Sequence, residues 1–151
     1  MRHAILSLIF LLTTGITGLA ARPAPEAAPD RLLEKAKSFC RPYQADSVGY
    51  YLGRCADLYR QQDSLEAWTE AYKQVGRSVL AGGGDPAAAI AIIRKSLGGE
   101  AWREPRTDSE WNVRAWAYVL LAFTYNHYVR DFEQSRANYE QAAAIFRERG
   151  V

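Results

Sequence analysis

The region from Asp108 to Gly150 constrains the fold of this chain more than any other part of the sequence. Apolar and small residues recur there at steps of three or four, the spacing that places side chains on one face of an α-helix. They form two series, separated by a short turn at Tyr128–Asp131. Two amphipathic helices joined by a short turn pack as antiparallel neighbours. The sequence therefore predicts a helix hairpin over this region.

Residues at the ends of both predicted helices have capping preferences. Thr107 is followed three residues later by Glu110, the capping-box pattern in which each side chain satisfies a backbone N–H near the helix start. Asp131, with Gln134 three residues on, is placed to cap the second helix. Gly150 follows the last apolar residues, and glycine commonly ends a helix. These signals predict where both helices begin and where the second one ends.

Each predicted helix carries one stripe of alternating large and small residues. On the first helix the stripe is Trp111, Ala115, Tyr118, Ala122 and Tyr125, and on the second it is Phe132, Ser135, Tyr139, Ala142 and Phe146. Alternation of this kind lets two helices approach closely and interdigitate. We therefore expect both stripes to be buried between the two helices.

The hairpin resembles the tetratricopeptide repeat, whose signature combines small and aromatic residues at fixed positions of two helices. The matching residues are Tyr118, Leu121, Ala122, Tyr125, Ser135, Tyr139 and Ala142. The pattern departs from the family because Ser135 replaces Ala, the turn is about one residue longer than in a unit of about 34 residues, and the closing Pro is absent. A second, longer unit upstream has the same spacing, with Tyr72, Val75, Gly76, Val79, Asp85, Ala89, Ile93 and Ser96.

This resemblance, which covers Tyr72 to Phe146, implies an all-α fold: a short α-solenoid of about three antiparallel helix hairpins over residues 30–151. Further helices are expected from the periodicity and from capping residues. They run from Asp30 to about Phe39, from Asp46 or Ser47, from Asp63-Ser64, and from Asp85-Pro86 to Gly98-Gly99. No segment has the alternation expected of a strand.

The first 29 residues are expected to lie outside this domain. Residues 1–20 combine Arg2 with an apolar run and small residues, the pattern of a cleavable signal peptide. An uncleaved anchor helix is the alternative. Residues 21–29 read as a Pro/Ala-rich linker. The export signal predicts a periplasmic or secreted protein, most simply a bacterial one, with no membrane association beyond the signal peptide.

The charge balance argues against a polyanionic partner. The 151 residues include 19 Lys and Arg against 17 Asp and Glu, and one of the basic residues, Arg2, lies in the export segment. A nearly neutral chain has no electrostatic basis for nucleic-acid binding or for attraction to an anionic membrane.

Cys40 and Cys55 are the two cysteines of the chain. In an exported protein such a pair commonly forms a disulfide, so a bridge is expected. The alternative is a pair of buried free thiols, because free Cys is often buried.

The expected binding surface lies on the first helix of each unit, since the resemblance implies that this face lines a groove for partners. Its candidate residues are Lys73, Arg77, Trp116, Phe123 and Asn126. Aromatic and Arg side chains often anchor interfaces, so the groove would hold a protein or peptide. Packing of Trp116 and Phe123 against the preceding hairpin is the alternative. The loop residue Trp102 is either functional or a plug on the helices.

The sequence offers no catalytic set, so we expect a non-catalytic interaction module or scaffold. His127 could pair with Asp131, but no nucleophile is placed beside them. No zinc-ligand spacing exists, and we expect neither a metal nor a cofactor. Two alternatives stay open: a helical binder of an apolar small molecule, and a cell-envelope hydrolase using paired carboxylates such as Glu66 with Glu70 or Glu133 with Glu140. The sequence does not indicate an oligomeric state.

Overall fold

The computed structural model describes residues 28–97 and 101–150, and every regular element in these two ranges is a helix. The prediction of an all-α fold is confirmed for this part of the chain. The elements are α1 (Pro29–Ser38), α2 (Ala45–Gln61), α3 (Leu65–Ala81), α4 (Pro86–Arg94), α5 (Asp108–Thr124), the π-helix η2 (Tyr125–Val129) and α6 (Phe132–Arg149). The expected signal peptide, most of the expected linker and the expected helix end at Gly98-Gly99 lie outside the described residues.

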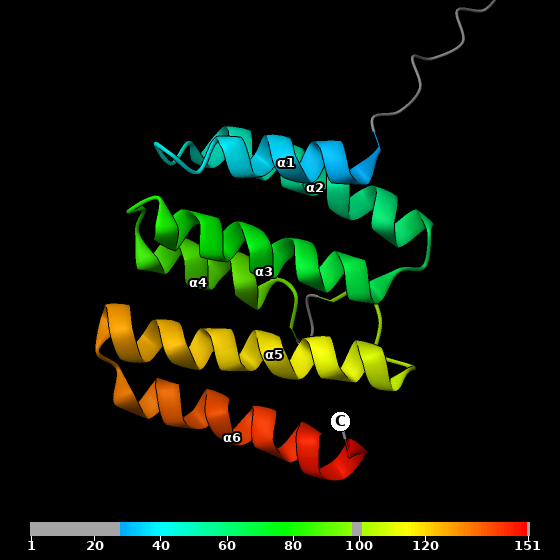
Figure 1. Cartoon of the computed structure of the whole chain (residues 1–151), viewed down its shortest axis with the longest axis vertical. Coiled ribbons are helices and arrows are strands. Elements are labelled where there is room, and N and C mark those ends of the chain that lie inside the picture. The colour runs from blue at the N-terminus through cyan, green and yellow to red at the C-terminus, as the bar shows by residue number, and fades with distance from the viewer. Residues whose placement is uncertain (1–27, 98–100, 151) are drawn as a thin grey trace, which may run out of the picture.

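Consecutive helices form three pairs, α1 with α2, α3 with α4, and α5 with α6, which follow one another in chain order along the long axis of the molecule (Figure 1). In this view α1 and α3 lie in front of α2 and α4. The central helix is α3, which packs against α1, α2, α4 and α5. The third pair is therefore joined to the rest of the molecule mainly through α3.

The strongest capping signals act as the sequence predicts. Thr107 and Glu110 form a complete capping box at the start of α5. The Asp85 side chain accepts from the Ala87 N–H, and the Asp131 side chain accepts from the Gln134 N–H. Gly150 ends α6 in the left-handed conformation, with a φ of 67°. Each of these signals needs only a partner within three residues, so local sequence is sufficient to specify it.

At the other three helices the expected side-chain caps do not form, although α3 begins directly after Ser64, as predicted. Asp30 lies in the first turn of α1, which begins at Pro29, and accepts from the Tyr59 hydroxyl at 3.0 Å instead of capping. The N-cap of α2 is Gln44, upstream of Asp46 and Ser47, and makes no side-chain cap hydrogen bond. Asp63, before α3, has a φ of 52° and points its carboxylate to Arg103. The carboxylates of Asp30 and Asp63 therefore bind side chains distant in sequence and do not cap the nearby helix.

The described core has two parts. The larger cluster combines α1, α2, α3 and the start of α4, with Leu65, Val75 and Val79 among its most buried side chains. The smaller cluster joins α4 to α5 and η2, through Ile90, Ile93, Leu97, Ala117, Leu121 and Tyr125. No residue of α6 belongs to either described cluster, so the last helix is held differently from the others.

The stripe predicted for α6 is only partly correct. Ser135 and Ala142 are buried, together with Asn138, but Phe132 is 64% exposed and Tyr139 is 43% exposed. The buried side chains of α6 are small or short, α6 also meets α5 through the Trp116–Phe146 ring contact, and the rings of Phe132 and Tyr139 stay outside. On the first predicted helix Ala115, Ala122 and Tyr125 are buried, but Tyr118 and Tyr125 pack in the smaller cluster with α4 and not between α5 and α6.

Candidate functional site

The five predicted partner-binding residues lie on two adjacent elements of the stack. Lys73 and Arg77 are on α3, Trp116 and Phe123 are on α5, and Asn126 is in η2, which continues α5. Because α3 and α5 pack against each other, the structure brings the two groups to neighbouring helices. None of the five lines any of the four clefts described below.

Lys73 is buried and paired with a carboxylate of its own helix. It is only 5% exposed, and its Nζ atom donates to the Glu70 carboxylate at 2.6 Å. A buried ammonium that already has a carboxylate partner offers little to a ligand. Arg77, one turn later, is exposed and forms no ion pair with any described residue. Of the two predicted cations, the structure leaves Arg77 accessible.

Trp116 and Phe123 remain at the surface, 48% and 41% exposed. The Trp116 ring meets the edge of Phe146 on α6, with ring centres 5.9 Å apart. Phe123 lies against the His127 ring at 4.3 Å. The alternative in which the preceding hairpin covers both rings would leave them buried, which is not observed. Asn126 is partly exposed beside them.

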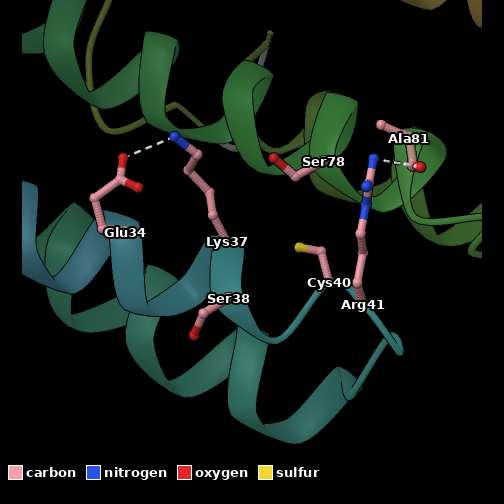
Figure 2. A pocket seen from close by; sticks show the side chains of 7 residues that line it. All are labelled: Glu34, Lys37, Ser38, Cys40, Arg41, Ser78 and Ala81. Atoms are coloured by element: carbon pink, nitrogen blue, oxygen red, sulfur yellow. Dashed lines mark hydrogen bonds and ion pairs between the residues drawn. The ribbon is translucent and has the colours of Figure 1, made fainter.

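A cleft of about 410 Å³ lies between α3 and the end of α1, as Figure 2 shows. Lys37 pairs with Glu34 at 2.7 Å, and Arg41 donates to the Ala81 carbonyl oxygen at 2.6 Å. Both cations therefore have partners at this cleft. Ser38, Cys40 and Ser78 complete its polar lining.

The predicted disulfide between Cys40 and Cys55 is wrong. Both residues are free and completely buried. The Cys40 thiol contacts the Ala36 carbonyl oxygen, while burial raises the pKa of the Cys55 thiol to about 11. Burial also raises the pKa of Cys40. Thiols held in the protonated form are poor nucleophiles, so neither is prepared for chemistry.

The loop before α5 is fixed by a network of charges. Arg103 donates to Glu110 through two nitrogens and to Asp63 at 2.8 Å, which joins the α2–α3 turn to the start of α5. These hydrogen bonds, opposed by burial, lower the pKa of Glu110 to about 2 and raise that of Arg103. Arg114 pairs with Glu104 in the same loop. The loop is therefore a clamp between the second and third helix pairs.

Trp102 begins this loop and packs against the larger core cluster, while the Arg103 guanidinium lies 4.6 Å from the centre of its ring. Its indole N–H is buried and has no acceptor among the described residues. A buried donor without a partner is unusual in a folded protein.

Lys95, which follows α4, lines three clefts that sequence reasoning did not find. One cleft of about 550 Å³ lies between α4 and η2, where Arg94 donates to the Tyr125 hydroxyl at 2.7 Å. Of the other two, a cleft of about 270 Å³ lies between α2 and α4, and one of about 220 Å³ lies between α2 and α3, where Trp102 also lines it. The adjacent cations Arg94-Lys95 were the available sequence signal, but periodicity alone did not reveal which helices would flank them.

The residues considered for chemistry have other neighbours. Asp131 caps α6, and its predicted partner His127 stacks on Phe123. Glu66 accepts from Ser109, Glu70 pairs with Lys73, and Glu140 pairs with Arg136 at 3.8 Å. Across residues 28–97 and 101–150, no three His, Cys, Asp or Glu side chains gather as metal ligands. Within the same ranges, no helix has the length and hydrophobicity to cross a membrane.

Comparison with protein-family models, with curated proteins and with solved structures gives no match for this chain.

Proposed function

We propose that this chain is an exported helical-repeat module, similar to tetratricopeptide-repeat proteins, which binds a peptide or protein segment and catalyses no reaction. In this proposal the three helix pairs are successive units of a short solenoid, and residues 1–20 direct export. The partner lies across α3 and α5.

The observation that carries the proposal is the exposure of Trp116 and Phe123, seven residues apart on the same face of α5. Large aromatic rings are favoured anchors at protein interfaces, because they bury much area at a small cost in conformational entropy. Arg77 on the neighbouring helix supplies an accessible cation, which would orient an acidic group of the partner. Lys73 is not part of the proposed surface, because it is buried with Glu70.

Site-specific photo-crosslinking tests this proposal. A photoreactive phenylalanine replaces Trp116 in the full chain, and the matched control carries the same group at Tyr50, a 58% exposed residue of α2. In cells that export the protein, we expect a discrete adduct from position 116 that is absent from position 50 and is lost with Arg77→Glu. Identical adducts from both positions, or none from position 116, would contradict the proposed surface.

A further inference from the structure

A continuous groove runs along α2, between α2 and α4 in one cleft and between α2 and α3 in the next; α2 and α4 lie behind α1 and α3 in Figure 1. The two clefts of about 270 and 220 Å³ share Gly53, Tyr72 and Lys95, and therefore adjoin. Tyr72 is contributed by α3, against which both α2 and α4 pack. We call these two clefts together the α2–α4 groove. None of the residues named for the surface proposed above lines this groove, although α3 contributes to both.

The groove is long compared with its width. Its lining on α2 extends from Ala45 to Arg60, which corresponds to about 22 Å at about 1.5 Å per helical residue. On α4 it extends from Ala88 to Lys95. An extended peptide of about seven residues has this length, at about 3.3 Å per residue. The shape fits a peptide better than a compact metabolite.

Small residues keep the groove open. Ala45, Gly49 and Gly53 recur every four residues on α2 and therefore lie on one face. A Cβ atom added at Gly49 or Gly53 would meet nothing within 4 Å. The remaining lining is mostly apolar, with Val48, Leu52, Ala91 and Ile92. Apolar side chains of a peptide could be accommodated along this wall.

The polar groups of the groove favour a carboxylate. Lys95, where the two clefts meet, is exposed and forms no ion pair with any described residue. The Trp102 indole, at one end, has a buried N–H with no acceptor in the part of the chain that the structure describes. The other charged residues of the groove, Arg60 and Asp57, pair with each other at 2.5 Å. The groove therefore has an excess of donors and one uncompensated positive charge.

We infer that the α2–α4 groove binds a peptide segment in which an internal Asp or Glu is flanked by apolar residues. The acid is internal because the groove continues on both sides of Lys95, toward Tyr43 and toward Trp102. The carboxylate accepts from Lys95, and the flanking side chains lie on the small-residue wall of α2. Trp102 lines the same groove.

Capped heptapeptide pools provide the probe. Each peptide has a central Glu and three flanking positions on each side drawn from Ala, Leu, Ser and Thr, with both ends blocked and a neutral dye attached. Matched pools carry a central Gln or a central Lys, and a fourth pool carries Gln with a free C-terminal carboxylate. Binding to the full chain is measured by fluorescence anisotropy. We expect the Glu pool to bind about fivefold or more tightly than the Gln pool, as for a partly desolvated ion pair.

Three variants locate the site. Lys95→Glu should remove the preference for the Glu pool and create a preference for the Lys pool. Gly53→Leu should weaken the Glu pool by about tenfold, because it fills the groove, while thermal unfolding shows that the fold is kept. Lys35→Glu, the same charge change on an exposed residue of α1, should leave binding unchanged.

Equal affinity for the Glu and Gln pools would overturn the inference, as would a failure of the Glu pool to bind at millimolar concentration. If the pool with a free C-terminal carboxylate bound more tightly than the Glu pool, the inference that the recognised acid is internal would be wrong. Binding that survives both Lys95→Glu and Gly53→Leu would overturn the location. Trp116→Ala should not alter this binding. The test of the α2–α4 groove is therefore independent of the test of the surface on α5.

Discussion

The first two helix pairs and the third pair bury their residues in different ways. In α1 to α4, large side chains such as Leu65 and Trp68 fill a shared core. In α6 the buried residues are the small or short Ser135, Asn138 and Ala142, and most of the exposed large apolar residues of the described chain lie in α5, in α6 or in the turn that joins them.

The difference shows that similar amphipathic patterns can lead to opposite outcomes. A helix in the middle of the stack has neighbours on several sides, as α3 has, so its large residues are covered. The last helix has one main neighbour, α5, and the remaining surface of α6 meets solvent. Position in the stack therefore decides whether an aromatic residue is core or surface.

The largest expected effect compares one core residue with one surface residue. Leu65→Ala, at a position 2% exposed in α3, should cost about 2–5 kcal/mol of unfolding free energy. Tyr139→Ala, in α6, should change it by less than about 0.5 kcal/mol. Urea unfolding of both variants measures the two values. Similar losses of unfolding free energy in the two variants would show that α6 is packed as tightly as α3.

The clamp between the two regions is the next target. Because the pKa of Glu110 falls from its ordinary 4.5 to about 2 on folding, its carboxylate stabilises the folded state by roughly 3 kcal/mol above pH 4.5. This contribution is lost as the pH falls from about 4.5 to about 2. Glu110→Gln should remove it and flatten that part of the stability profile.

Urea titrations at pH 5, 3.5 and 2.5 would test the clamp, with the exposed Glu133→Gln of α6 as the matched control. If Glu110→Gln and Glu133→Gln had the same acid profile, the Arg103 network would contribute nothing to joining the two regions.

Two glycines within the first region should respond in opposite directions. Gly76→Ala would place a Cβ atom against the Ile93 side chain, where α3 meets α4, and should cost about 1–3 kcal/mol. Gly53→Ala has open space and should add up to about 1 kcal/mol, because Ala favours a helix. Thermal unfolding measures both. Equal effects would mean that α3 and α4 are not in close contact at Gly76.

The smallest effect concerns the two thiols in the first region. Because Cys40 and Cys55 are free and buried, a reductant should shift the unfolding free energy by less than about 0.5 kcal/mol, where loss of a native disulfide costs about 2–5 kcal/mol. Labelling with a thiol reagent at pH 8 should be slow until denaturant is added, since the pKa of Cys55 is about 11. Rapid labelling of the folded chain would contradict their burial.

The helices and several of their ends could be predicted from sequence. Thr107, Asp85 and Asp131 cap helices as their spacing indicates, and Gly150 ends the last one. The continuation of α5 into the π-helix was not foreseen, although the turn at Tyr128–Asp131 was. Arg130, which ends the π-helix, adopts the left-handed backbone conformation, and no residue pattern predicted it.

The candidate site could be predicted only in part. Trp116, Phe123 and Arg77 lie at the surface, as a groove would need, whereas Lys73 is buried with Glu70. Lys95 and Trp102 were not identified as parts of one groove, because they come from segments on either side of the loop before α5. Their proximity depends on how α2 and α4 pack on α3.

By itself the sequence determined that this protein is helical and where most of its helices begin, because hydrogen bonds and caps join groups only three or four residues apart. Tertiary structure alone decided which helix faces are covered and that Cys40 and Cys55 form no disulfide. It also decided that the Asp63 carboxylate binds Arg103 and does not cap α3. Those outcomes depend on which helices become neighbours. Which distant helices come into contact depends on packing of the whole chain. A local sequence pattern does not contain that information.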